Sequence, residues 1–149
     1  MRLAFEIDAI VHVASRRSRE RQRAEPVVMS DSEPEPDVAV VRGSETDYLK
    51  RHPEPADVCL VIEVSVSSLL TDRYKAEIYA EAGIPNYWIV NLINSQLESY
   101  SQPELTPAGL RYSNCQHLGP GDRLQVILEG RNVGSLSAEE MLPAIPRPA

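Results

Sequence analysis

Residues 57–92 contain an apolar run, a segment with helical periodicity and a second apolar run. Of all features of the sequence, this succession limits the possible folds most strongly. The first run, DVCLVIEV, covers residues 57–64 and is rich in Val and Ile, as is typical of a strand buried on both faces. Residues 70–82 predict a helix, because four apolar residues recur at every fourth position and line one stripe: Leu70, Tyr74, Ile78 and Ala82. Gly83 and Pro85 end it. Since NYWIVNL at 86–92 predicts another strand, we expect a crossover unit with two parallel strands in an α/β core.

The rest of the chain predicts short strands and one further helix. Strands are expected at 5–14, 26–30, 37–41, 96–101, 110–114 and 123–129, separated by turns that contain Pro and Gly. Ser137 and Glu140 in SAEE form a capping-box signature for a short helix. A chain of 149 residues is long enough for one core, so we expect a single domain over 1–149 with a frayed tail at 143–149.

Composition and charge narrow the class of protein. No apolar stretch approaches the roughly 20 residues that a membrane span needs, and two cysteines cannot build a disulfide framework. We therefore expect a soluble, cytoplasmic protein without a membrane partner. The net charge of −7 argues against nucleic acid, but residues 15–23 hold five arginines and one glutamate. That basic strip is either a solvated arm or an edge that follows phosphates.

Glu63 stands near the end of the apolar run and needs a partner. In an extended chain it shares one face with Cys59, Val61 and Ser65. A buried, ionised carboxylate costs several kcal/mol unless it is paired, hydrogen-bonded or bound to a cation. The carboxyl end of a central strand is where open α/β sheets gather their sites. The alternative is a glutamate that emerges into solvent at the strand end.

Asp37 and Lys75 are the charged residues that the fold could bring near Glu63. Asp37 begins a strand expected beside the Glu63 strand, and Lys75 lies on the helix that follows it. Two carboxylates form a hard oxygen site suited to Mg²⁺ or Mn²⁺, and a lysine adds positive charge for an attacking water. Read singly, Lys75 pairs with Asp72 on the surface and Asp37 is a turn residue after Pro36. Together the three residues suggest metal-assisted phosphodiester hydrolysis.

Three blocks carry a resemblance to a known family: SEPEPDVAVVRG, RHPEPADVCLVIEVSVSS and DRYKAEIYAEAGIPNYWIVNL. They resemble the Uma-type family of bacterial endonucleases, a domain of unknown function assigned to the restriction-endonuclease-like PD-(D/E)xK superfamily. The resemblance implies a central mixed sheet flanked by helices, with Asp37 and Glu63 as the metal-binding acids. Ser65 stands where the superfamily usually has its lysine, and Lys75 matches members whose lysine lies on the following helix.

The chain departs from the family pattern in two places. The stretch from Ser68 to Lys75 is about one residue shorter than is usual in the family, and residues 1–25 match poorly. Family members carry an additional glutamate in a longer N-terminal region, and Glu6 is the candidate for it. The alternative to Glu6 as that glutamate is a family member with a shortened N-terminus. In that case we expect a catalytically inactive module that binds nucleic acid or protein.

The functional hypothesis combines these residues. Asp37, Glu63 and the backbone carbonyl of Val64 would hold Mg²⁺ or Mn²⁺, and Lys75 would orient the attacking water, with DNA as the favoured substrate and a homodimer as a possible assembly. Other chemistries have less support. The serines after Glu63 lack the glycines of a nucleophile elbow, and Cys115 with His117 lacks a second zinc-binding pair. Tyr87 and Trp88 are expected in the sheet core rather than in a base-stacking surface.

Overall fold

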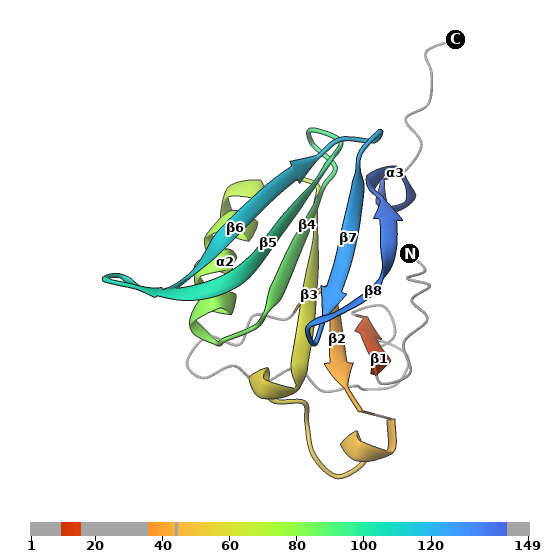
Figure 1. Ribbon diagram of the computed structural model, residues 1–149, viewed down its shortest axis with the longest axis vertical. Helices are drawn as coiled ribbons and strands as arrows, with labels where there is room; N and C mark the ends of the chain where they lie inside the picture. Colours follow the sequence, from red (N-terminus) through yellow and green to blue (C-terminus); the bar gives the residue numbers. More distant parts are fainter. Residues whose placement is uncertain (1–9, 16–35, 44, 143–149) are drawn as a thin grey trace.

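The computed structural model describes residues 10–15, 36–43 and 45–142. Among these residues, the main sheet has six strands in the order β1-β2-β3-β4-β5-β6 (Figure 1). These strands are Ile10–Ser15, Val38–Arg42, Val58–Ser65, Asn86–Asn91, Gln96–Thr106 and Gly109–Leu118. Of the described strands, β3 and β4 run parallel and the other neighbours are antiparallel, so the sheet is mixed.

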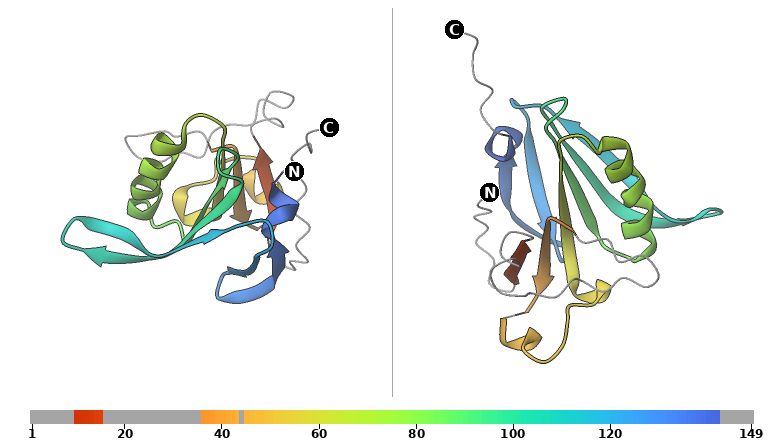
Figure 2. Two further views of the ribbon diagram at one scale, coloured as in Figure 1. Left: turned by 90° about the horizontal axis from the view of Figure 1, so that it is seen from above. Right: turned by 180° about the vertical axis from the view of Figure 1, so that it is seen from behind.

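Different elements cover the two faces of this sheet (Figure 2). The helix α2, Leu69–Glu81, lies on one face, where Val61, Tyr79, Tyr87 and Ile89 pack together. A hairpin of β7, Arg123–Leu128, and β8, Arg131–Ser137, lies on the other face with the short helix α3, Ala138–Met141. The hairpin of β5 and β6 extends beyond the rest of the molecule at its tip (Figure 1).

The predicted crossover unit is confirmed. Strand β3 is parallel to β4, with Glu63 opposite Ile89, and α2 connects them. Gly83 follows the helix with a φ of 76°, a left-handed conformation that glycine adopts without strain. The buried hydroxyl of Tyr87 donates a hydrogen bond of 2.8 Å to the backbone carbonyl of Asp72. This bond fixes the first turns of α2 against β4.

The predicted apolar stripe of α2 is not the face that packs on the sheet. Leu70 and Tyr74 are 81% and 63% exposed, whereas four other residues are buried: Asp72, Ala76, Tyr79 and Ala80. The predicted helix is confirmed, but the apolar stripe that predicted it is not the side that is buried. The buried side of this helix carries an aspartate, since it faces charged groups on the sheet.

A β-bulge changes the predicted faces of β3. Val40 pairs with Leu60 and Val41 pairs with Val58, so Cys59 is an extra residue on β3. Cys59 consequently packs in the same cluster as Leu60, on the hairpin side. The expectation that Cys59 shares a face with Glu63 was therefore wrong, while Val61 packs on the α2 side as expected.

The remaining elements follow the predicted pattern with different lengths. Strands β5 and β6 are longer than predicted, and β8 was not predicted. The capping box is present, with the backbone N–H of Ser137 donating to Glu140 Oε2 at 3.3 Å. Strand β1 overlaps the predicted strand at 5–14, whose residues 5–9, including Glu6, lie outside the described residues. The basic strip beyond Ser15, the predicted strand at 26–30 and the tail at 143–149 also lie outside them. None of the helices in the described part of the chain combines the length and the apolar composition of a membrane span.

Candidate active site

Asp37 and Glu63 meet where β2 begins and β3 approaches its end. Val38 pairs with Ile62, so the antiparallel register places the preceding Asp37 beside Glu63. The backbone N–H of Asp37 donates to Glu63 Oε1 at 3.1 Å, and the backbone N–H of Val64 donates to Asp37 Oδ2 at 2.8 Å. The Glu63 carboxylate is thus held by the backbone of Asp37, and the Asp37 carboxylate is held by the backbone of Val64, the residue after Glu63.

Lys75 reaches this pair of acids from α2. Its Nζ lies 2.9 Å from Glu63 Oε2 and 3.3 Å from Asp72 Oδ1. The structure therefore brings Asp37, Glu63 and Lys75 together. It also contains the pairing of Lys75 with Asp72 that the sequence left as an alternative.

Burial controls the electrostatics of Glu63. The residue is only 4% exposed. Burial raises its pKa above the ordinary value, and the charge of Asp37 adds to this effect, whereas the hydrogen bond and charge of Lys75 oppose it. Burial disfavours the charged form of Lys75, but Glu63 and Asp72 outweigh that effect and raise its pKa. Lys75 is therefore a cation in this arrangement.

Asp72 is the residue of this cluster that the sequence reasoning did not select. It is 2% exposed, and its Oδ2 accepts a hydrogen bond of 2.8 Å from the hydroxyl of Ser68. The available signal was spacing, because Asp72 stands three residues before Lys75 and four after Ser68 on a helix. In the sequence this spacing predicts a surface pair of Lys75 with Asp72, which is the alternative to a role for Lys75 in the site.

Ser65 occupies the position after Glu63 on the same face of β3, where the superfamily usually has a lysine. Its side chain is buried, and its Oγ has no hydrogen-bond partner among the described residues. The cation of the cluster comes instead from α2, as the resemblance implied.

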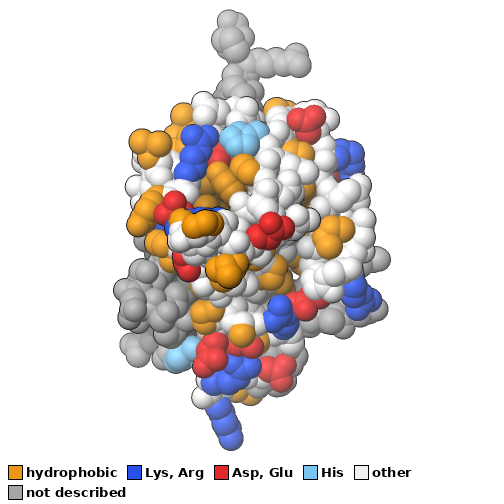
Figure 3. Space-filling model, turned by 60° about the vertical axis from the view of Figure 1, so that its left-hand side comes forward, with side chains coloured by type: hydrophobic (Ala, Val, Ile, Leu, Met, Phe, Trp, Pro, Cys, Tyr) orange, Lys and Arg blue, Asp and Glu red, His pale blue; other side chains and the backbone are white. Residues whose placement is uncertain are grey.

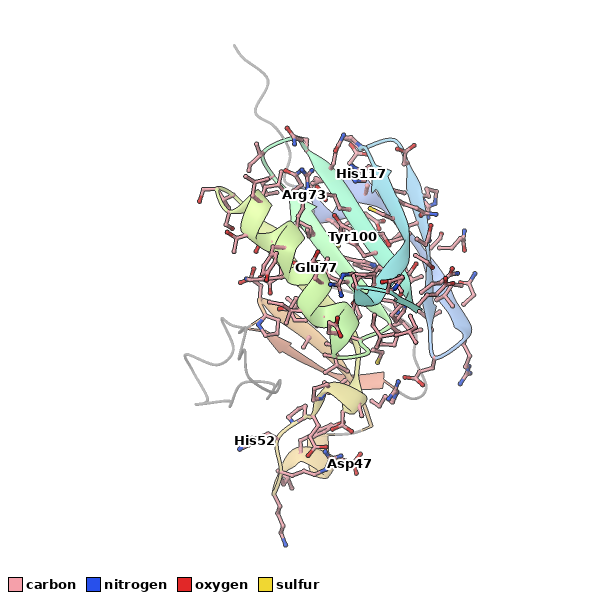
Figure 4. The ribbon with its side chains drawn as sticks, turned by 90° about the vertical axis from the view of Figure 1, so that its left-hand side faces the viewer. Asp47, His52, Arg73, Glu77, Tyr100 and His117 are labelled. Atoms are coloured by element: carbon pink, nitrogen blue, oxygen red, sulfur yellow. The ribbon has the colours of Figure 1, made fainter. Side chains whose placement is uncertain are left out.

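A second buried glutamate lies on the same face of the sheet. Glu98 on β5 pairs with Ile89, which pairs with Glu63, so the two glutamates lie in one row across the strands. Arg73 makes two hydrogen bonds to Glu98, at 3.0 and 2.8 Å, and further bonds come from Tyr100 at 2.8 Å and Asn91 at 3.0 Å. In Figure 4, Arg73 lies on α2 with Tyr100 and His117 on the strands behind it, far from Asp47 and His52.

The donor set at Asp37 and Glu63 fits a small divalent cation. Mg²⁺ in proteins is typically bound by one or two carboxylates, with waters and substrate phosphates as the other ligands. The described residues contain no group of three or more His, Cys, Asp or Glu side chains arranged to hold a metal. Asp37 and Glu63 would supply two carboxylates of that kind, with waters and a substrate phosphate as the remaining ligands.

The face in Figure 3 is mixed in charge. Basic side chains are scattered among acidic and hydrophobic ones, with no continuous basic field on the described part of that face. A cavity of about 510 Å³ lies on the opposite side of the sheet, between β4–β6 and β7, with Trp88, Gln116 and Arg123 in its lining. It does not include the acidic cluster.

Tyr87 and Trp88 are buried, which confirms their place in the core.

Comparison with known proteins identifies the family. The model of the Uma2 family, described as a putative restriction endonuclease, matches residues 2–137. No curated protein matches the chain. The mixed sheet with its helical crossover confirms the expected α+β fold of the restriction-endonuclease-like class. The family supports a nuclease-like function, with DNA as the substrate class of restriction endonucleases. Since the match covers most of its length, the chain belongs to the Uma2 family.

Proposed function

We propose that the protein is a metal-dependent endonuclease that hydrolyses phosphodiester bonds in DNA. The observation that carries this proposal is the contact between Asp37 and Glu63 with the Lys75 ammonium 2.9 Å from Glu63. Two acids from neighbouring strands and one cation from the next helix form the minimal set for phosphodiester hydrolysis. The proposal places the protein in the cytoplasm, where DNA is accessible.

Asp37 and Glu63, with the backbone carbonyl of Val64, would hold Mg²⁺ or Mn²⁺. When bound, such an ion lowers the pKa of a water and polarises a phosphate oxygen. Asp37 is already oriented for this task, because the N–H of Val64 holds one of its oxygens at 2.8 Å. Preorganised ligands do not have to be ordered when the cation and substrate arrive.

Lys75 supplies the positive charge that the two acids cannot. Its raised pKa keeps it protonated, so it acts as a hydrogen-bond donor and counter-charge rather than as a base. In that state it can orient a water with one N–H while other N–H groups remain on Glu63 or Asp72. It would also stabilise negative charge that develops on the phosphate oxygens.

Plasmid cleavage tests the proposal. Purified protein should nick or linearise plasmid DNA with Mg²⁺ or Mn²⁺ and should lose this activity in EDTA. Asp37→Asn should abolish cleavage, whereas Glu104→Gln, which makes the same change of charge at an exposed residue of β5, should not. Cleavage that survives in Asp37→Asn would reject the assignment. Light scattering with and without DNA tests whether the active species is a homodimer.

A catalytically inactive, nuclease-like module is the second candidate. The observation that favours it is the mixed charge of the face in Figure 3, which has no continuous basic field for phosphate, together with the net charge of −7 of the whole chain. In that case DNA or protein binding persists in EDTA, and no divalent ion produces cleavage. Fluorescence anisotropy with labelled DNA, measured alongside the cleavage assay, separates the two functions.

A further inference from the structure

Asp72 is a buried carboxylate to which the proposed chemistry assigns no task. Its carboxylate makes two contacts, one with the hydroxyl of Ser68 at 2.8 Å and one with Lys75 Nζ at 3.3 Å. Its backbone carbonyl accepts the hydroxyl of the buried Tyr87 at 2.8 Å. Burial of a carboxylate is unfavourable unless its partners compensate, so this placement ties Asp72 to Lys75.

The contacts of Lys75 show why a second anchor matters. The ammonium lies between Glu63 Oε2 and Asp72 Oδ1, and its side chain is 24% exposed. A lysine has a long, flexible side chain, so loss of one carboxylate partner allows it to move into solvent. Glu63 is also a proposed ligand of the cation. An oxygen of Glu63 that turns toward a divalent ion holds Lys75 less firmly, while Asp72 keeps its contact.

We propose that Asp72 is a positioning residue that retains the Lys75 ammonium beside the site when Glu63 engages the metal. This inference rests on the proposed nuclease function and deepens it. Asp72 touches neither the cation nor the substrate and acts through Lys75. Ser68 orients the Asp72 carboxylate, and the bond from Tyr87 fixes the helical turn that carries it. Residues that orient catalytic groups in this way typically affect activity by about 10- to 100-fold.

The kinetic test uses Asp72→Asn, which keeps the shape of the side chain and removes its charge. The matched control is Glu77→Gln, which removes one charge from the exposed side of the same helix. We expect cleavage by Asp72→Asn to fall about 10- to 100-fold in kcat with KM for DNA unchanged, and Mn²⁺ affinity by calorimetry to match that of the control. Unchanged kcat overturns the proposal. A loss of Mn²⁺ affinity also overturns it, because Asp72 would then be a metal ligand.

A second test follows Lys75 without requiring cleavage. The chain has two lysines, and the exposed Lys50 serves as an internal standard for amine acylation measured by mass spectrometry. In Asp72→Asn we expect acylation of Lys75 relative to Lys50 to rise at least about 3-fold, since an amine released from an ion pair is more reactive. Mg²⁺ should enlarge this difference. Glu77→Gln should leave the ratio at the wild-type value.

These readouts separate the two proposals. If the wild-type protein cleaves no DNA with any divalent ion, the proposed function fails, while a raised acylation ratio in Asp72→Asn still shows that Asp72 holds Lys75. An unchanged ratio in Asp72→Asn overturns the positioning role even in an active enzyme. Should Asp72→Asn fail to fold, Ser68→Ala is the second variant. Ser68 is exposed, and the substitution removes the hydroxyl that orients the Asp72 carboxylate. Ser68→Ala should raise the ratio to a smaller extent, and no increase overturns the proposal.

Discussion

Glu63 and Glu98 lie in one row of the same sheet beneath the same helix, yet their surroundings are opposite. Burial acts to raise the pKa of both carboxyl groups. At Glu98, hydrogen bonds from Arg73, Tyr100 and Asn91 outweigh burial and lower the pKa. At Glu63, burial is the largest effect and Asp37 adds a negative charge, while Lys75, which Glu63 shares with Asp72, opposes both, so the pKa stays raised.

The difference separates a structural carboxylate from one available for chemistry. The oxygens of Glu98 accept four hydrogen bonds from protein donors, which leaves little capacity for a ligand. Among the described residues, Glu63 and Asp72 share the one Lys75 ammonium, whereas Arg73 hydrogen-bonds Glu98 through two of its nitrogens. Glu63 is therefore the glutamate of this row that we expect to act as a ligand.

The largest expected effect is on activity. Glu63→Gln should lower metal-dependent cleavage by about a thousand-fold, because loss of a ligand charge removes about 4 kcal/mol of transition-state stabilisation. Glu98→Gln makes the same change at the other glutamate of the row. This variant should leave cleavage within a few-fold of wild type, roughly 1 kcal/mol or less of transition-state stabilisation. The measurement is plasmid cleavage in Mg²⁺ at one protein concentration. Equal losses in the two variants would remove the distinction between the glutamates.

The next effect is on stability. Arg73→Met keeps the aliphatic stem and leaves Glu98, which is fully buried, with only its neutral donors. We expect the free energy of unfolding to fall by about 2 to 3 kcal/mol in denaturant titrations. Arg111→Met is the matched control, because its partner Glu81 is exposed, and it should cost less than about 1 kcal/mol. Glu98→Gln added to Arg73→Met should restore part of the loss.

The pH dependence of unfolding should have opposite signs at the two sites. Glu98 has a lowered pKa in the fold, so its contribution to stability is full above the unfolded value of about 4.3 and is lost as pH falls through the folded value. Glu63 has a raised pKa, so its contribution is full below the unfolded value and is lost as pH rises through the folded value. Denaturant unfolding in EDTA from acid to neutral pH measures both.

The variants assign these contributions to individual residues. Glu98→Gln should flatten the loss of stability on the acid side, while Glu63→Gln should remove a loss on the neutral side. Identical pH profiles for the two variants would contradict the opposite pKa shifts.

The smallest effects come from the tyrosines. Tyr100→Phe removes a hydrogen bond of 2.8 Å to Glu98 and should cost about 1.5 kcal/mol of unfolding free energy. Tyr79 lies 3.5 Å from Glu63 Oε1, at the limit of hydrogen bonding, so Tyr79→Phe should cost about 0.5 kcal/mol. Thermal unfolding of the two variants under one buffer condition makes the comparison. The reverse order would mean that Glu63 depends more on its tyrosine than Glu98 does.

Local pattern was sufficient to predict the crossover unit, because long apolar strands and a helix that ends at Gly83 have few alternatives. It was also sufficient to select Asp37, Glu63 and Lys75 as neighbours, since consecutive strands usually pair. The roles of these residues stay predictions. Asp72 was not selected, because hydrophobic periodicity gives no weight to a buried aspartate on the packed face of a helix.

Glu98 was missed for a different reason. Its partners come from α2, β4 and β5, and nothing in the local sequence shows that they meet. The bulge at Cys59 was equally invisible, because a single extra residue in an apolar run leaves the composition of the strand unchanged. Features that depend on several distant elements, or on register, required the structure.

The bulge at Cys59 also allows the preceding connection to vary in length without moving Asp37 and Glu63. It lies between the connection that spans residues 43–57 and the paired segment that presents Glu63 to Asp37. A change of one residue in the connection next to β3 can be accommodated at the bulge. The side chains after the bulge then stay on the same faces of the sheet. Homologous chains can therefore acquire insertions or deletions in this connection while both carboxylates continue to face the same helix.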